Sequence, residues 1–458
     1  MEEIKKYILG NKDKFIEELF SLIRIPSVSA HSHRNKEIQQ CAERWSQLLD
    51  DAGAEKISIM PTKGNPVVFA SKILDDKFPT VLVYGHYDVM PAEPLDLWVS
   101  KPFEPEIRDE KIFARGADDD KGQSFMHAKA FEYLLKSKQL KCNVKFLLEG
   151  EEEISSPSLE DFCVKNKELL QCDVVLVSDT SMLSAEMPSI TTGLRGLAYF
   201  QIEVTSASRD LHSGIFGGAV ANPINELAKI LAQLTDKDGR ITIPGFYDDV
   251  EEVSEYERSL IAKIPFDENE YKSNLNIKDV FGEKGYSTLE RTGIRPTLDV
   301  CGIWGGYIEE GAKTVLPSKA FAKLSTRLVP HQHHEIIAQL VENYLKEIAP
   351  DYISLDVNVL HGAESYVCPI DSVEYKAAEN AYTRVFGKKP LPVRRGGSIG
   401  VVPIFEKVLK VKPILMGFGL ESDAIHSPNE NFPLDLFYKG IETIINFYLE
   451  LQKAYSKD

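Results

Sequence analysis

The stretch Pro79-Thr80-Val81-Leu82-Val83-Tyr84-Gly85-His86-Tyr87-Asp88 is a short apolar run that leads directly into a histidine and an aspartate. Two further apolar runs, Cys142 to Leu148 and Asp173 to Val177, are also followed by acidic residues. Runs of this length are typical of buried strands. The segments between them, Gly122 to Lys136 and Ser158 to Lys167, have a helical pattern. Strands and helices therefore alternate, which predicts an α/β layer.

Carboxylates gather in short clusters, and we expect each cluster at the carboxyl end of a strand, where open α/β sheets bind ligands. Three adjacent aspartates, Asp118, Asp119 and Asp120, lie between two glycines and repel one another unless cations neutralise them. One of the three is therefore expected to bridge two metal ions. Within Glu151-Glu152-Glu153, one glutamate can bind a metal while its neighbour accepts the proton of metal-bound water.

The stretch Pro79 to Asp88 ends in a His-x-Asp pair, of which only one member can comfortably face a given metal. We assign His86 as the ligand and Asp88 as the carboxylate that holds its other ring nitrogen. Taken alone, this pair is more often a surface turn, and Asp179 and His426 are ordinary loop residues. Together, carboxylates and imidazoles without a thiolate suit two Zn²⁺, Mn²⁺ or Co²⁺ ions about 3.5 to 4 Å apart. The leading interpretation is a metal-dependent hydrolase.

Composition places the chain among ordinary globular proteins. It has 458 residues, more than one hydrophobic core usually supports, and it is 43% hydrophobic and 27% charged. The formal net charge of −17 disfavours a nucleic-acid or anionic-membrane partner, because both attract basic surfaces. No stretch approaches the roughly 20 apolar residues of a membrane span.

The expected compartment is the cytoplasm. The segment Met1 to Phe20 has a helical pattern and lacks the uninterrupted apolar core of a signal peptide. The six cysteines are widely separated and form no CxxC pair, so the sequence predicts neither a disulfide framework nor a zinc-thiolate site. We expect reduced, mostly buried thiols.

The alternating pattern is interrupted in the middle of the chain, after Thr192-Gly193-Leu194-Arg195-Gly196. Beyond about residue 366 it returns, with a C-terminal helix from Pro433 to Ala454. We therefore predict a discontinuous α/β domain of residues 1–194 and 367–458, interrupted by an α+β domain of residues 195–366. The α+β domain is predicted to hold strands at Leu197 to Val204, Ala320 to Val329 and Ile353 to Leu360, and helices at Asn222 to Leu234 and His331 to Ile348.

Several motifs along nearly the whole chain occur in the order of one protein family. The chain resembles the M20 family of metallopeptidases, most closely its dipeptidase branch, which includes the carnosine and cytosolic non-specific dipeptidases. The motifs that carry the resemblance are Tyr84-Gly85-His86-Tyr87-Asp88-Val89, Arg115-Gly116 with Asp119-Asp120-Lys121-Gly122, Glu149-Gly150 with Glu152-Glu153, Asp210-Leu211-His212-Ser213-Gly214, Lys313-Thr314-Val315-Leu316-Pro317, Arg327-Leu328-Val329-Pro330 and Gly396-Gly397-Ser398-Ile399.

The resemblance implies a three-layer α/β catalytic domain with two metal sites. His86, Asp119 and Asp179 would hold one ion, and Asp119, Glu153 and His426 the other, with Asp119 as the bridge. Glu152 would be the general base toward a metal-bridging water, Asp88 would orient His86, and the Asp119-Asp120 peptide would be cis.

The resemblance further implies that the α+β domain is a lid that carries a homodimer contact. His212 matches the histidine that reaches the partner's active site and steadies the oxyanion. Arg327 suits a substrate carboxylate, and Gly397 and Ser398 lie in a turn that can add hydrogen bonds. The expected activity is two-metal hydrolysis of dipeptides or small peptides at an amide bond near a free carboxylate, with Zn²⁺ first and Mn²⁺ or Co²⁺ as alternatives.

Two other functions stay open on the sequence. An N-acyl amino acid amidohydrolase, of the deacylase or desuccinylase type, would use the same metals, and a non-catalytic metal-binding relative would keep the site without turnover. The chain also departs from its branch at several positions, among them Ile154-Ser155-Ser156 in place of a Ser-Gly-Ser-like run. Asp118 replaces a serine or threonine and is expected to add negative charge beside the metals, Arg395 replaces a glutamate and is expected to alter substrate preference, and Glu151 replaces a neutral residue.

Overall fold

The computed structural model describes residues 2–397 and 399–456 and divides into two compact units. The first comprises the chain up to Thr192, Cys368–Val393 and the chain from Gly400 onward. The second comprises Gly193–Val367 and Arg394–Ile399. The junctions near 193 and 367 lie within two residues of those predicted, whereas the short segment Arg394–Ile399 was expected in the α/β domain and belongs instead to the second unit.

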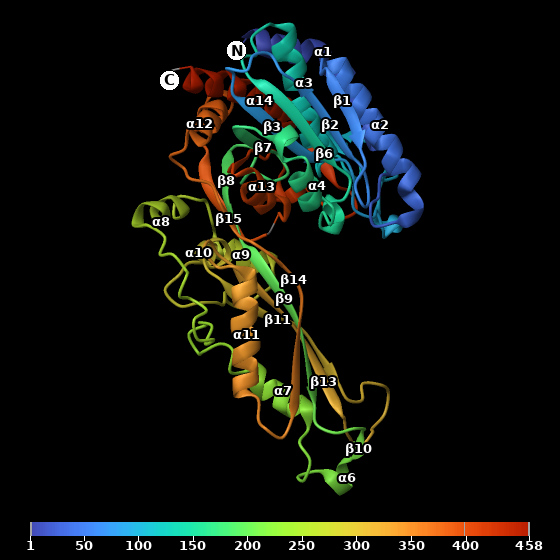
Figure 1. Cartoon of the computed structure of the whole chain (residues 1–458), viewed down its shortest axis with the longest axis vertical. Coiled ribbons are helices and arrows are strands. Elements are labelled where there is room, and N and C mark those ends of the chain that lie inside the picture. Colours follow the sequence, from blue (N-terminus) through green and yellow to red (C-terminus); the bar gives the residue numbers. More distant parts are fainter. Residues whose placement is uncertain (1, 398, 457–458) are drawn as a thin grey trace. The chain divides into compact units, whose positions relative to one another are not determined.

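The described residues of the first unit and its junction form a nine-stranded mixed sheet (Figure 1). In spatial order it holds β1 (Lys56–Met60), β2 (Val67–Lys72), β6 (Asn143–Glu149), β3 (Thr80–His86), β7 (Val174–Val177), β17 (Pro413–Leu415), β8 (Ser189–Leu194) and β15 (Tyr366–Val367), with β16 (Leu391–Arg395) paired to β8. Strands β6, β3, β7 and β17 are parallel, and every side chain of β7 is buried, as expected for a strand covered on both faces.

Helices cover both faces of this sheet, which the register of β3 and β6 demonstrates. Val83 of β3 aligns with Phe146 of β6. The ring of Phe146 packs on that of Phe131, with the ring centres 5.5 Å apart. Tyr84 is next along the strand and points to the opposite face, where it packs on Phe405 at 5.2 Å. Phe131 belongs to the layer of α1 (Glu2–Ile23), α2 (Asn35–Ala52), α3 (Lys121–Lys136), α12 (Val373–Phe386) and α14 (Leu434–Tyr455), and Phe405 to that of α4 (Leu159–Lys165), α5 (Lys167–Leu170) and α13 (Val401–Leu409). The predicted three-layer α/β fold is confirmed.

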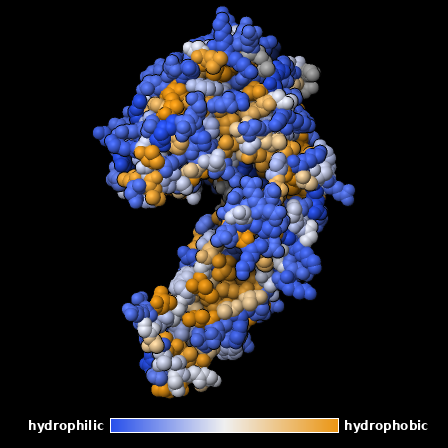
Figure 2. Space-filling model, turned by 180° about the vertical axis from the view of Figure 1, so that it is seen from behind, coloured by the Kyte–Doolittle hydropathy of each residue, from blue (hydrophilic) through white to orange (hydrophobic). Residues whose placement is uncertain are grey.

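The second unit is built on a four-stranded antiparallel sheet in the order β11 (Thr297–Gly305), β13 (Lys319–Leu328), β9 (Gly196–Thr205) and β14 (Ser354–Ala363). Buried and half-buried residues alternate strictly along β9, because one face of the sheet is covered and the other is not. Figure 2 shows the molecule from behind, with hydrophobic surface exposed over this unit among hydrophilic residues.

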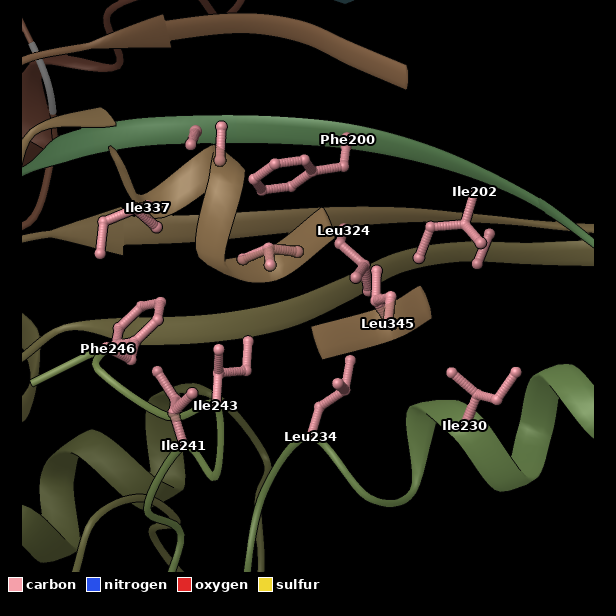
Figure 3. Packing of buried hydrophobic residues seen from close by; sticks show 14 of the residues in the cluster. Phe200, Ile202, Ile230, Leu234, Ile241, Ile243, Phe246, Leu324, Ile337 and Leu345 are labelled. Atoms are coloured by element: carbon pink, nitrogen blue, oxygen red, sulfur yellow. The ribbon is translucent and has the colours of Figure 1, made fainter. Parts of the chain in front are cut away.

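The covered face packs on α7 (Pro223–Leu231) and α11 (His334–Ile348). Figure 3 shows Phe200, Ile202 and Leu324 of the strands in one cluster with Ile337 and Leu345 of α11. The predicted α+β architecture is therefore confirmed. The helix expected from His331 begins later, at His334, because His331 has a φ of 72°, which a right-handed helix does not accommodate.

The remaining elements are short. The described chain also holds β4 (Glu106–Arg108), β5 (Lys111–Phe113) and β18 (Asn431–Pro433) in a separate small sheet, the pair β10 (Leu211–His212) and β12 (Val315–Leu316), helices α6 (Ser213–Phe216), α8 (Glu255–Ile261), α9 (Glu268–Asn274) and α10 (Thr288–Gly293), and 3-10 turns at Ser32–Arg34, Leu95–Leu97, Glu152–Ile154 and Glu421–Asp423.

No helix within residues 2–397 and 399–456 has the length and apolarity that a membrane crossing requires. All six cysteines are free, and four of them are buried, in agreement with the expected reduced thiols.

Candidate metal centre

Five side chains with metal-binding atoms come together in the first unit and form two groups that share one aspartate. His86 Nε2 lies 3.0 Å from Oδ1 of Asp119 and 3.9 Å from Oδ2 of Asp179. His426 Nε2 lies 2.9 Å from the other oxygen of Asp119 and 3.1 Å from Oε2 of Glu153. Within each group the donor atoms lie within 4.8 Å of one another, and the described residues form no third group of this kind. Each oxygen of Asp119 thus faces a different histidine, which is the arrangement a bridging carboxylate needs.

The sheet brings three of these residues to one edge. His86 is the last residue of β3, Asp179 follows the neighbouring parallel strand β7 by two positions, and Glu153 follows β6 on the other side. For these the expected location at strand carboxyl ends is confirmed. It is wrong for Asp119, which follows no strand of the large sheet and lies directly before α3.

The Asp119-Asp120 peptide is cis, as the motifs predicted. Asp120 connects this turn to the end of β3, because its Oδ2 accepts the backbone N–H of His86 at 3.1 Å and also the hydroxyl of Ser124. Gly85 makes the approach possible: a Cβ at this position would lie 1.8 Å from the Ser124 hydroxyl oxygen. Asp119 and His86 are therefore connected by one buried network.

Asp88 contacts both the first histidine and the segment of the glutamates. His86 Nδ1 lies 3.1 Å from the Asp88 carbonyl oxygen and 3.4 Å from its carboxylate. The same carboxylate accepts the backbone N–H of Glu152 at 3.2 Å and of Glu153 at 3.1 Å. If the His86 ring donates from Nδ1, its Nε2 is left with a lone pair toward Asp119 and Asp179.

The loop of the three glutamates is packed closely against its surroundings. A Cβ at Gly150 would lie 2.5 Å from the Tyr87 hydroxyl oxygen, so only glycine fits there. Glu153 accepts the backbone N–H of Met90 through Oε1 at 3.0 Å, which leaves Oε2 to His426. Glu151 accepts the backbone N–H of Asn65 at 3.0 Å.

Carboxylates stabilise the protonated forms of both histidines. Burial opposes protonation of His86, yet hydrogen bonds to Asp119 and Asp88 raise its pKa well above the ordinary value. Hydrogen bonds to Asp119 and Glu153 raise the pKa of His426 to about 10. The same histidines lower the pKa of Asp119 in spite of its burial. A divalent cation would replace these protons, since it needs neutral imidazoles and charged carboxylates in the same places.

In contrast to Asp119, three neighbouring carboxyl groups have raised pKa values. Burial raises the pKa of Glu152 well above its ordinary value, that of Glu153 to about 7 and that of Asp179 to about 6. The negative charge of Asp119 adds to each of these shifts. The cluster therefore holds more negative charge than its own histidines neutralise, and the donor set fits two divalent cations.

Asp118, one of the departures from the branch, is buried near two other carboxyl groups, those of Asp423 and Glu430. Burial, followed by the charges of Asp423 and Glu430, raises the pKa of Asp118 well above its ordinary value. Its carboxyl packs so closely that a Cβ at Gly419 would lie 2.3 Å from Oδ2. Burial thus works against the extra negative charge that was expected beside the metals.

Sequence reasoning missed two residues of this centre, Arg115 as a separate contributor and Glu430 altogether. Glu430 accepts the backbone N–H of Asp119 at 3.1 Å and pairs with Arg115 at 2.7 Å. The sequence marks Arg115 only as part of the motif Arg115-Gly116, without a role of its own. Glu430 has no sequence signal beyond its place four residues after His426.

Three of the remaining predicted residues, His212, Arg327 and Gly397, belong to the second unit. His212 is exposed on β10, and its Nδ1 accepts the backbone N–H of Gly214 at 3.0 Å, so the neutral ring carries its proton on Nε2. Arg327 lies on the open face of β13, where β9 places Leu197 beside it. Gly397 is exposed. Ser398 lies outside the described residues.

A second arginine, Arg195, lies near Arg327. Arg195 donates to the carbonyl oxygen of Gly396 at 3.2 Å and to those of Arg291 and Arg295 at 3.3 Å. Burial and the nearby charge of Arg327 lower the pKa of the Arg195 guanidinium to about 10. Arg195 thus connects the Gly396-Gly397 turn to the segment of Arg291 and Arg295 within the same unit.

Known proteins are similar to this chain over nearly its whole length. A family model described as peptidase family M20/M25/M40 matches residues 82–450. The Beta-Ala-His dipeptidase of Rattus norvegicus is 30% identical over 476 residues, covering 100% of this chain and 96% of its own. The Cys-Gly metallodipeptidase of Schizosaccharomyces pombe is 33% identical over 470 residues, covering 98% of each chain. The crystal structure of an M20 family metallo-carboxypeptidase from Sulfolobus solfataricus matches with a TM-score of 0.84 at 33% identity, covering 96% of this chain and 99% of that one.

Proposed function

The chain belongs to peptidase family M20/M25/M40, and on that premise we propose that it is a metallodipeptidase that uses two divalent cations to hydrolyse an amide bond near a free carboxylate. One observation carries the proposal: two groups of one imidazole and two carboxylates share Asp119. His86, Asp119 and Asp179 would hold one ion, and Asp119, Glu153 and His426 the other. Bound there, the ions would supply an activated water and polarise the scissile carbonyl.

The proposed proton carrier is Glu152. Its backbone N–H donates to the Asp88 carboxylate, and the side chain of the next residue, Glu153, contacts His426. The main chain of Glu152 is therefore held beside the two metal groups. Burial raises its pKa, which suits a group that takes a proton from water and returns it to the leaving amine. Asp88 is proposed to hold His86 in the tautomer whose Nε2 faces the shared aspartate.

The second unit is proposed to recognise the carboxyl end of the substrate. Arg327 offers the fork of N–H donors that a carboxylate accepts, and Arg195 adds a second cation beside it while tying down the Gly396-Gly397 turn. His212 is proposed to donate from Nε2 to the oxyanion, because its Nδ1 is already occupied by Gly214.

We propose that the protein is a homodimer through its second unit. Support comes from β11, an edge strand with Val300, Ile303 and Trp304 exposed at 46%, 51% and 41%. Apolar edge strands left uncovered invite pairing with another chain. Ile303→Glu is expected to weaken dimerisation at least about 30-fold, because burying an unpaired carboxylate costs about 2 kcal/mol or more.

Sedimentation velocity over a range of protein concentrations measures this effect. Ile73→Glu is the matched control, since Ile73 is exposed at 41% in the first unit. A dimer that dissociates equally in both variants, or a parent protein that sediments as a monomer at every concentration, would contradict the proposed interface.

We propose Zn²⁺ as the first candidate for both sites, with Mn²⁺ or Co²⁺ as alternatives, because all three accept imidazole and carboxylate ligands. A cytoplasmic location is part of the same proposal, and the six free thiols fit a reducing compartment.

A substrate panel tests the proposed activity. Metal-depleted protein is given back Zn²⁺, Mn²⁺ or Co²⁺ and assayed on Beta-Ala-His, Cys-Gly and other free dipeptides, with N-acetyl amino acids alongside. We expect metal-dependent release of free amino acids from dipeptides, with kcat/KM at least about 100-fold above that for N-acetyl amino acids, a difference of about 2.7 kcal/mol. Activity confined to N-acyl substrates would instead assign the enzyme to the amidohydrolases, and inactivity on both classes would favour a binding role.

A further inference from the structure

Glu430 is fully buried and accepts four N–H donors from the segment that leads to the bridging aspartate. Its Oε2 accepts Nη1 of Arg115 at 2.7 Å and the backbone N–H of Gly116 at 2.9 Å. Its Oε1 accepts the backbone N–H groups of Asp118 at 3.0 Å and Asp119 at 3.1 Å. Each oxygen of the Glu430 carboxylate thus accepts two hydrogen bonds, from the backbone of residues 116–119 and from the Arg115 guanidinium.

The main chain on either side of Glu430 is tied to the same segment. Its carbonyl oxygen accepts the N–H of Ala114 at 3.1 Å, and the next residue, Asn431, pairs with Phe113 where β18 meets β5. Asn431 Nδ2 also donates to the carbonyl oxygen of Asp423 at 3.2 Å, which closes the loop that carries His426. The loop of His426 therefore has its far end fixed on the strand that precedes the aspartates.

Arg115 extends this connection to a third segment. Besides Glu430, it donates to the carbonyl oxygen of Pro91 at 3.1 Å, and its guanidinium lies 5.5 Å from the centre of the Trp98 ring. Pro91 follows Met90, whose N–H holds Glu153. The Arg115 and Glu430 pair thus contacts the backbone beside Asp119 and the end of the loop of His426. It also contacts Pro91, which follows the residue whose N–H binds the Glu153 carboxylate.

His426 needs such support more than the other ligands do. Its side chain is 48% exposed, its backbone has a φ of 59°, and it lies in a loop rather than at the end of a strand. His86, by contrast, is fully buried on β3. Without a fixed loop, the 2.9 Å approach of His426 to Asp119 would depend on the metal itself.

We propose that Glu430, together with Arg115, is a positioning residue of the second metal site, which sets the spacing of His426 and Asp119 before the metal binds. The inference rests on the proposed ligand assignment and adds to it a residue that touches neither metal nor substrate. Its consequence is selective: loss of Glu430 weakens the ion held by Asp119, Glu153 and His426 more than the ion held by His86, Asp119 and Asp179.

Glutamine at position 430 removes the arrangement with little change of volume. Its amide has one acceptor oxygen and one NH₂ donor, so either Arg115 and Gly116 or Asp118 and Asp119 would face a donor in place of an acceptor. We expect Glu430→Gln to bind one of its two metal ions about 10- to 100-fold more weakly, while the other keeps close to its parental affinity. At saturating metal, KM should stay near its parental value.

Zn²⁺ is titrated into a mixture of the metal-depleted protein and a chelating indicator. The competition gives the Zn²⁺ affinity of each of the two metal groups. The absorption of the Co²⁺ protein reports the geometry of each site separately from turnover. Glu283→Gln is the matched control, because Glu283 is buried in a two-bond pair with Arg295 at 2.7 and 2.8 Å within the second unit. This control should lose stability without a change in either metal affinity.

Two parental affinities in Glu430→Gln, together with a stability loss like that of the control, would overturn the proposal and leave Glu430 with a purely structural role. If Glu430→Gln does not fold, Arg115→Lys decides: it keeps the cation and loses the Pro91 contact, and we expect a several-fold selective loss in the same site. His426→Ala separates this failure from failure of the ligand assignment. If that variant keeps both ions tightly bound, the assignment itself is wrong.

Discussion

Glutamine in place of Glu152 is expected to lower kcat on a dipeptide by about 10²- to 10⁴-fold while both metal sites remain filled. The amide has nearly the same shape as the carboxylate but cannot take a proton from water. The backbone of residue 152 is held by Asp88 independently of its side chain, so the loop should keep its place. Steady-state kinetics and metal analysis on the same sample measure both quantities.

Glu151→Gln is the matched control for this change. Glu151 is the preceding residue, and its carboxylate accepts the N–H of Asn65, with no contact to the two metal groups among its hydrogen bonds. Its replacement should change kcat only a few-fold. Full turnover by Glu152→Gln with both metals bound would mean that another group accepts the proton.

The strands of the catalytic layer were predictable because of their surroundings. β3, β6 and β7 are parallel and largely buried, so each contains an apolar run that a candidate ligand closely follows. β1 was not predicted, because its residues Lys56–Met60 are half-exposed and only loosely apolar. Boundaries were less accurate where capping residues decide them, as at His331, which precedes α11 and is outside it.

The residues of the candidate site also differ in how far the sequence predicts them. Residues that follow strands, such as His86 and Asp179, stand out because a polar residue after an apolar run has a local signal. Glu430 has none, since its partner Arg115 lies 315 residues away in the chain and only folding brings the two together. The raised pKa of Asp118 could not be predicted from the sequence either, because it arises from burial and from the charges of Asp423 and Glu430.

Asparagine in place of Asp119 is expected to remove both metal ions together and to lower activity about 10³-fold or more, equivalent to about 4 kcal/mol of barrier. Asp119 is the one residue that contributes to both groups, with one oxygen near His86 and the other near His426. Asparagine keeps one oxygen, but it is neutral, and its NH₂ group would point at one of the two imidazole nitrogens. Neither site would retain the charged bridging ligand.

Comparison with Asp179→Asn isolates the bridging role. Asp179 belongs only to the group of His86, so its replacement should weaken one ion and leave the other. Metal content after dialysis against a weak chelator, measured together with the thermal unfolding of the metal-free proteins, distinguishes ligand loss from unfolding. If Asp119→Asn kept one ion at its parental affinity, the two groups would be independent, and the shared carboxylate would not bridge them.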